Sequence, residues 1–214
     1  MHPGYLSNAY LVADVEGGTA VFVDSGAPLE PLREAADRWD VTPVAVLRTH
    51  GHADHVEHED ELGLPVVTGD FEEGGLRVQA LPTPGHSDDH VAFVVNGEAV
   101  FSGDILFKDA VGGSRDDFES VKRSVMDVLL ALPDDTRVLP GHTDETTIGR
   151  EREHNPFVRV WLGAEPEGTE AVKVAGEDAT LVVWSPDYDG KGKAWVRFAD
   201  DGSDAIVGGS RVER

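Results

Sequence analysis

The sequence contains no cysteine. This absence excludes disulfide bonds, a cysteine nucleophile and thiolate metal ligands, so any metal site has to be built from His, Asp and Glu. It also favours a cytoplasmic location, because nothing in the chain requires an oxidising compartment. The first residues, Met1 to Tyr5, do not form a basic region followed by an apolar run, and we therefore expect no signal peptide.

Basic residues are scarce. The 214 residues include 18 Lys and Arg against 41 Asp and Glu, which gives a formal net charge of −23 at pH 7. Such a chain is repelled by phosphate backbones and by anionic membrane surfaces, so we expect neither a nucleic-acid nor a membrane partner. No apolar run approaches the roughly 18 residues of a membrane-spanning helix. The expected partner is a small-molecule substrate, and the oligomeric state is left open.

Motifs for nucleotide binding and serine catalysis are also missing. The sequence has no GxGxxG, no P-loop and no G-x-S-x-G. Each of these patterns carries a specific chemistry, either a phosphate-binding loop or a serine nucleophile on a sharp turn. The sequence therefore gives no support to a nucleotide-binding protein or a serine hydrolase.

Residues 1–163 predict one domain of the α/β class. Apolar residues at spacings of three and four predict a helix over 29–39 and another over 115–132. Between turn residues, short apolar segments predict strands over 5–13, 19–23, 43–47, 64–68, 76–81, 90–95, 99–101 and 136–139. This alternation is compatible with sheets covered by helices.

Residues 164–214 have a different character. The stretch 164–168 is rich in Glu, Pro and Gly and is typical of a linker. Residues 181–184 and 194–198 predict a hairpin, and 205–207 a third strand. Because three short strands are marginal in isolation, we expect a β-rich C-terminal extension that packs on the first domain.

Three of the nine histidines fall within six residues, His50-Gly51-His52-Ala53-Asp54-His55. The cluster follows the strand predicted to end at Leu47. On a loop that leaves a strand these side chains can converge, and a cation accepts several ring nitrogens at once. The cluster therefore predicts a metal site, the alternative being a solvated histidine-rich loop.

Three further strands end in a glycine followed by a single polar residue. These endings are Gly85-His86, Gly103-Asp104 and Gly141-His142. Each is weak evidence alone, since a lone Gly-His pair is usually a turn with an exposed histidine. Together they predict that three more ligands reach the edge where the histidine cluster lies.

This set of motifs resembles the metallo-β-lactamase superfamily. The matching blocks, in the family's order, are Asp24-Ser25-Gly26, the run from His50 to His55, Gly85-His86, Gly103-Asp104 and Gly141-His142. The closer resemblance is to the glyoxalase II-like (hydroxyacylglutathione hydrolase-like) branch. It is carried by Asn8-x-Tyr10-Leu11, Arg115-x-Asp117-Phe118, Thr146-Thr147-Ile148-Gly149 and Asn155-Pro156-Phe157. The resemblance implies a four-layer αβ/βα sandwich with a metal site at one edge of its two sheets.

The resemblance also implies a set of ligands for two metal ions. The first ion would be bound by His50, His52 and His86, and the second by Asp54, His55 and His142, with Asp104 bridging both. Asp24 would accept a ring N–H from a ligand histidine, although a turn-initiating aspartate before Ser25-Gly26 is the alternative. The ions implied are divalent, with Zn²⁺ ahead of Fe or Mn.

The chemistry expected of such a site is hydrolysis. A bound divalent cation lowers the pKa of water from 15.7 to about 7 and so supplies metal-bound hydroxide at neutral pH. Asp54 would be the catalytic residue that orients this nucleophile. A thiol departs readily as thiolate, so the expected substrate is a thioester or a related small ester. Lys108 and Arg115 are candidates for binding a substrate carboxylate, or they are ordinary surface charges.

Two other functions remain open at this point. A persulfide dioxygenase of the same branch would use one iron bound by His50, His86 and Asp104. A non-catalytic, metal-stabilised binding module is the third possibility, although structural sites are usually closed by four ligands. Two departures from the glyoxalase II pattern leave the substrate open. Glyoxalase II enzymes continue into a helical region after the metal domain, whereas the C-terminal part of this chain is β-rich. Acidic residues also follow His55.

Overall fold

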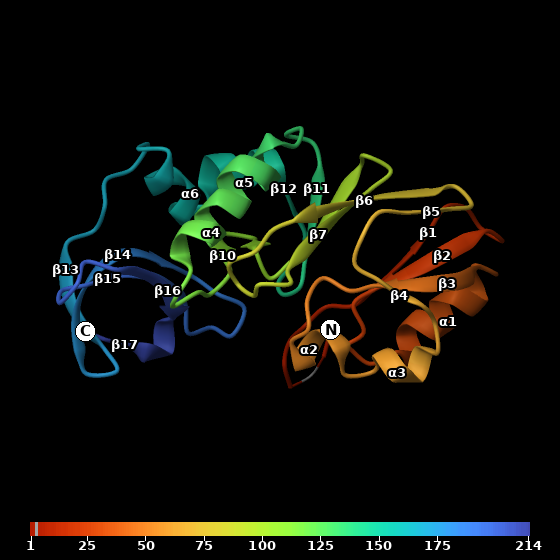
Figure 1. The fold of residues 1–214 in the computed structure, drawn as a ribbon, viewed down its shortest axis with the longest axis horizontal. Helices are drawn as coiled ribbons and strands as arrows, with labels where there is room; N and C mark the ends of the chain where they lie inside the picture. The colour runs from red at the N-terminus through yellow and green to blue at the C-terminus, as the bar shows by residue number, and fades with distance from the viewer. Residues whose placement is uncertain (3) are drawn as a thin grey trace.

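The computed structural model describes residues 1–2 and 4–214, and its first sheet is formed by the N-terminal part of the chain (Figure 1). The strand order is β1–β2–β3–β4, with β1 antiparallel to β2 and the others parallel. The strands are β1 (Tyr10–Ala13), β2 (Thr19–Val23), β3 (Thr42–Leu47) and β4 (Val66–Val67). The strand expected over 5–13 begins only at Tyr10, because Leu6 has a φ of 60° and Ser7 pairs with His142.

The second sheet has the strand order β12–β11–β8–β7–β6–β5. Its strands are β5 (Phe71–Glu73), β6 (Leu76–Pro82), β7 (Val91–Val95), β8 (Ala99–Gly103), β11 (Arg137–Pro140) and β12 (Thr146–Thr147). A short hairpin of β9 (Leu106–Phe107) and β10 (Ala110–Val111) follows β8. Strand β7 is antiparallel to both β6 and β8, and β8 is parallel to β11. Strands β6, β8 and β11 therefore run the same way, and their carboxyl ends share one edge.

A hydrophobic core joins the two sheets face to face. Its buried members are Val21, Val23, Ala45 and Leu47 from the first sheet and Leu76, Val78, Phe93, Val95 and Phe101 from the second. Helix α1 (Glu30–Arg38) covers the outer face of the first sheet, where Ala36 packs with Ala20. Helices on the outer face of the second sheet complete a helix–sheet–sheet–helix order (Figure 1).

The remaining helices are short. They are α2 (Ala53–Val56), α3 (Glu59–Leu62), α4 (Phe118–Arg123), α5 (Ile148–His154) and α6 (Pro156–Trp161). The helix expected over 115–132 begins at Phe118, because the Asp117 side chain caps it by accepting the Ser120 N–H. It then changes into a π-helical turn, η1 (Ser124–Val128), and a 3₁₀ turn, η2 (Leu129–Ala131).

The C-terminal part forms a third, antiparallel sheet with the order β16–β15–β14–β13–β17. Its strands are β13 (Glu170–Val174), β14 (Glu177–Ser185), β15 (Lys193–Phe198), β16 (Asp204–Gly208) and β17 (Val212–Glu213), with a 3₁₀ turn, η3 (Gly209–Arg211), before β17. Val183, Trp195 and Ile206 pack into the same core as Phe118 of α4. The sheet is therefore joined to the rest of the molecule by apolar contacts, while the boundary at residues 163 and 164 stays a prediction.

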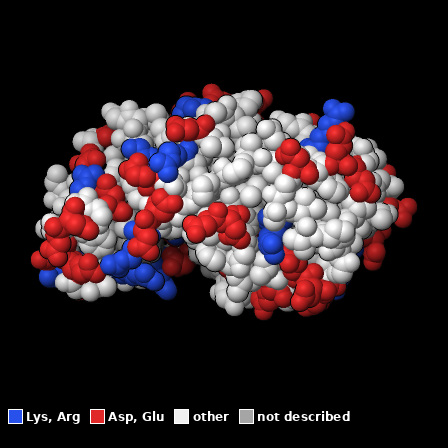
Figure 2. All heavy atoms as spheres, viewed as in Figure 1, with Lys and Arg blue, Asp and Glu red and all other residues white. Residues whose placement is uncertain are grey.

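Among the described residues, no helix has the length and apolar character needed to cross a bilayer. Figure 2 shows acidic side chains spread over the face drawn, with basic side chains among them.

Candidate metal centre

The histidine cluster begins where β3 ends. His50 and His52 lie on the loop after the strand, whereas Asp54 and His55 lie in the single turn of helix α2. The expectation of a loop throughout is thus wrong for the second half of the motif. Adjacent residues of a helix point about 100° apart, since a turn contains 3.6 residues. This turn sends Asp54 and His55 to the centre from separate directions.

The other three polar residues follow the carboxyl ends of β6, β8 and β11. These residues are His86, Asp104 and His142. The shared direction of the three strands brings them to one edge of the sheet, next to the loop after β3. Gly141 permits the close approach, because a Cβ on this residue would lie 2.3 Å from Asp104 Oδ1.

His50, His52 and His86 form one group whose ring nitrogens converge. His52 Nδ1 lies 3.0 Å from His50 Nε2 and 3.0 Å from His86 Nε2. His50 is buried, while His52 is exposed. Three imidazole nitrogens around one point suit a metal ion, which accepts a lone pair from each.

Asp54, His55, Asp104 and His142 form a second group. Asp54 Oδ2 lies 3.3 Å from His142 Nε2, and Asp104 Oδ2 lies 3.4 Å from the same nitrogen. Asp104 Oδ2 also lies 3.6 Å from His86 Nε2 of the first group. Asp104 therefore stands between the two groups.

Two buried atoms of the second group lack hydrogen bonds. His55 Nε2 and Asp104 Oδ1 are 3.3 Å apart, and neither has a hydrogen-bond partner among residues 1–2 and 4–214. Leaving buried polar atoms unpaired is costly, and native proteins rarely do so. A metal ion would satisfy both atoms, so the donor set fits a bound cation.

Groups behind the centre fix the orientation of the histidine rings. Asp24 Oδ2 lies 2.8 Å from His55 Nδ1, and Asp24 also accepts hydrogen bonds from the backbone and hydroxyl of Thr49. His86 Nδ1 donates to the carbonyl of Gly113, at 2.9 Å. His142 Nδ1 donates to the carbonyl of Leu6, at 3.0 Å. In each ring the other nitrogen, Nε2, is thereby left free for a metal.

His90 is a residue whose role the sequence did not reveal. The residue is 1% exposed. Its Nε2 accepts a hydrogen bond from the backbone N–H of Asp104, at 3.0 Å, so Nδ1 carries the proton and donates to Thr83 Oγ1. Burial lowers the pKa of His90 to about 3. His90 is therefore a neutral side chain that positions Asp104.

The two groups of histidines have opposite electrostatic surroundings. Burial lowers the pKa of His50 and His86, and the charge of His55 lowers that of His50 further. Burial acts the same way on His55, but the carboxylates of Asp104 and Asp24 raise its pKa to about 11. Against burial, Asp104 and Asp54 raise the pKa of His142 to about 9. Despite its own burial, Asp104 has a pKa well below the usual range, because His142 and His55 stabilise its charge.

Lys108 and Arg115 each contact a surface carboxylate. Lys108 Nζ lies 3.3 Å from Asp144 Oδ2. The Arg115 guanidinium donates to Glu177 on the C-terminal sheet, at 2.9 Å, and lies over the ring of Phe198. Their assignment to a substrate carboxylate stays a prediction.

Residues 2–56 match the family described as the Metallo-beta-lactamase superfamily. An uncharacterized protein of Mycobacterium tuberculosis is 34% identical, over 71% of this chain and 92% of its own length. Hydroxyacylglutathione hydrolase GloC of Haemophilus influenzae is 29% identical, over 72% of this chain and 93% of its own length.

Solved structures agree with the sequence relatives. ETHE1 from Myxococcus xanthus is 30% identical, with 72% of this chain and 80% of that chain covered and a TM-score of 0.63. TTHA1623 in a di-iron-bound form is 33% identical, with 73% of this chain and 98% of that chain covered and a TM-score of 0.59. The predicted α/β sandwich with a β-rich C-terminal extension is confirmed, and the chain belongs to the metallo-β-lactamase superfamily.

Proposed function

We propose that the protein is a hydrolase with two divalent metal ions that cleaves a thioester or a related small ester. The ligands proposed for the first ion are His50, His52 and His86, those for the second are Asp54, His55 and His142, and Asp104 bridges the two. The position of Asp104 carries the proposal, because its Oδ2 faces His86 of one group and His142 of the other. Zn²⁺ suits these nitrogen and oxygen donors, with Fe or Mn as alternatives, and the di-iron form of TTHA1623 supports a two-metal site.

Bound divalent ions would supply a water molecule acidic enough to lose its proton near pH 7 and would polarise a substrate carbonyl. Asp54 orients the attacking water in this proposal. Its side chain is 24% exposed, against 8% for Asp104, so it is the carboxylate of the second group that a solvent molecule reaches more easily.

A thioester suits a site whose titratable groups face metal ions. A cysteine-like thiol has a pKa of about 8.5 and leaves as thiolate without a strong acid to protonate it. The likeness to GloC, named as a hydroxyacylglutathione hydrolase, supports this substrate class. Lys108 and Arg115 remain the proposed contacts for a substrate carboxylate. To bind it, Lys108 would give up its contact with Asp144, and Arg115 its contact with Glu177.

The likeness to ETHE1 keeps a second candidate, the persulfide dioxygenase with one iron held by His50, His86 and Asp104. The geometry favours the hydrolase, because His52 Nδ1 is as close to His50 as to His86 and completes a group of three. A binding module without catalysis is disfavoured, because seven donors around two ions leave positions for water and substrate.

Two variants separate the enzymatic candidates. His142→Ala removes a ligand of the second ion only, so it should lower thioester hydrolysis severely, whereas a one-iron oxygenase should tolerate it. His86→Ala should damage either enzyme. Both variants are assayed for thioester hydrolysis and for oxygen uptake with a thiol persulfide. If His142→Ala retains most of the activity while His86→Ala loses it, the proposed hydrolase mechanism is wrong.

A further inference from the structure

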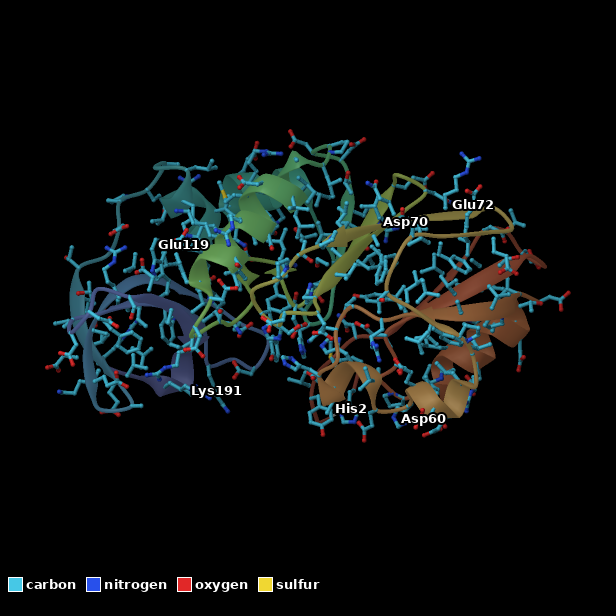
Figure 3. The ribbon with its side chains drawn as sticks, in the orientation of Figure 1. His2, Asp60, Asp70, Glu72, Glu119 and Lys191 are labelled. Carbon is cyan, nitrogen blue, oxygen red and sulfur yellow. The ribbon has the colours of Figure 1, made fainter. Side chains whose placement is uncertain are left out.

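The loop between β14 and β15 reaches from the C-terminal sheet toward the centre of the molecule (Figures 1 and 3, where Lys191 marks it). It carries Tyr188, whose ring stacks on the ring of His142 with centroids 4.0 Å apart and planes 7° from parallel. Phe107 meets both rings edge-on, at 5.9 Å from His142 and 6.1 Å from Tyr188. One face of His142 is therefore covered by a residue from the far end of the chain.

A buried ion pair holds this loop in place. Lys193 Nζ lies 3.0 Å from Asp187 Oδ2, and the two side chains are only 10% and 3% exposed. The ammonium group also lies 5.7 Å from the ring centroids of Phe107 and Tyr188. Because breaking a buried pair leaves an uncompensated charge, the pair fixes the chain on both sides of Tyr188.

The same sheet reaches the first group of histidines by another route. Ser114 and Ile206 of β16 exchange two backbone hydrogen bonds, of 2.9 and 2.7 Å. The preceding residue, Gly113, offers the carbonyl that accepts the His86 Nδ1–H. Strand β16 thus holds the segment that orients His86.

We propose that the C-terminal sheet is a positioning element of the metal centre, with Tyr188 as the residue that orients His142 for the second ion. This inference rests on the proposed function in that it takes His142 as a ligand of that ion. The Leu6 carbonyl fixes one edge of the His142 ring, and Tyr188 fixes its plane and keeps water from one face. Without the tyrosine ring, the imidazole of His142 can tilt while its hydrogen bond to the Leu6 carbonyl is kept.

The affinity of the second ion tests the inference directly. Full-length, metal-free protein is titrated with Zn²⁺ against a chromophoric chelator, and the two binding steps are fitted separately. Tyr188→Ala should weaken the second step about 2- to 10-fold, the range expected for an aromatic stacking contact, and leave the first unchanged. Tyr188→Phe keeps the stacked ring and should restore the second step. Trp39→Ala, which removes an exposed aromatic ring at the C-terminal end of helix α1, is the control.

The ion pair should act through the same ring. Lys193→Met should weaken the second step as Tyr188→Ala does, and the double variant should be no weaker than the weaker single variant. Lys173→Met, which breaks the exposed pair of Lys173 on β13 with Asp178 on β14, is the matched control and should change neither step.

Three results would overturn the inference: an unchanged second step in Tyr188→Ala, an equal loss in both steps, or no rescue by phenylalanine. Zn²⁺ binding is measured without a thioester, so failure of the inference is distinct from failure of the proposed activity. A wild-type protein that binds two ions but hydrolyses no thioester would contradict the proposed function alone.

Discussion

At the scale of single residues, the two groups of ligands hold different numbers of protons in the metal-free protein. Burial lowers the pKa of His50 and His86, so both rings are neutral at pH 7. Carboxylates raise the pKa of His55 to about 11 and that of His142 to about 9, so these two rings are protonated at the same pH. A metal ion needs the neutral ring, and its arrival therefore displaces protons from His55 and His142 but none from His50 or His86.

We predict that the second metal ion releases about one proton from each of these two histidines at pH 7, while His50 and His86 release none. Because the raised pKa values favour the protonated rings, the affinity of the second step should rise steeply with pH up to about 9, where His142 loses its proton unaided, and less steeply up to about 11, where His55 does. Calorimetric titrations in buffers of different ionisation enthalpy measure the protons released. Equal release in both steps would contradict the assignment.

His90 should contribute to stability through the backbone of Asp104. In His90→Leu the buried Asp104 N–H loses its acceptor, which should lower the free energy of unfolding by about 1–3 kcal/mol. Urea denaturation of the metal-free protein measures the change. His154→Leu, at a side chain 62% exposed, is the control. A loss no larger than the control's would show that His90 does not hold Asp104.

The residues of the centre differ in how far the sequence predicts them. The seven polar residues follow strand ends in a recognisable order, and the structure brings them together. His90 and Tyr188 gave no such signal. His90 acts through a backbone hydrogen bond, and Tyr188 meets His142 only because the third sheet packs beside the second. Both contacts depend on tertiary structure that no local pattern encodes.

At the scale of secondary-structure elements, Gly85 sets the distance between α4 and the chain that carries His86. Gly85 has a φ of 130°, and a Cβ on it would lie 2.4 Å from the backbone nitrogen of Val121. Ser124 of η1 also donates to the carbonyl of Pro84. The helix therefore rests directly on the segment that leads to a predicted ligand.

Gly85→Ala should destabilise the protein more than Gly97→Ala. Both substitutions strain a backbone with positive φ, at a cost of about 1–3 kcal/mol, but only Gly85 meets backbone atoms, since nothing lies within 4 Å of a Cβ at Gly97. The displaced α4 should also shift His86 and weaken the first metal-binding step. Urea denaturation and Zn²⁺ titration of both variants check this prediction. Equal losses of stability would rule out the proposed contact.

Patterning predicted most elements, and local packing decided the rest. The apolar stripe over 115–132 indicated a helix but not the π-helical turn at η1, since the stripe describes the buried face and not the hydrogen bonds. In the C-terminal part, the hairpin of β14 and β15 was predictable from its apolar residues. Strand β13 is buried only at Val172 and Val174, and β17 spans two residues, so the apolar pattern of the sequence predicted neither strand.

At the scale of the whole molecule, the third sheet and the second sheet share one core. The ring centroids of Trp195 in β15 and Phe118 in α4 are 4.9 Å apart, and Ile206 of β16 is buried in the same cluster. We therefore predict a single unfolding transition by calorimetry. Amide hydrogen exchange should give β14 and β15 the same global protection as β8. An earlier loss of protection in the C-terminal sheet would show that it unfolds separately.

The overall architecture was predictable because the motifs resemble those of a known family and their order fixes which strands end at the site. The resemblance covered residues 1 to about 160 and carried no information about where the tail would lie. Net charge and composition described the surface but not the fold. The contact between the tail and the metal centre therefore had to come from the structure.

Activity as a function of bound metal tests the two-metal hydrolase most directly. Metal-free protein is titrated with Zn²⁺, and thioester hydrolysis is followed after each addition. Because Asp104 faces both groups, activity should stay low through the first equivalent and rise in proportion to the second. Full hydrolytic activity at one equivalent of Zn²⁺ would contradict the account. So would an absence of hydrolysis at two equivalents, combined with oxygen uptake in the presence of a thiol persulfide when the protein is loaded with one iron.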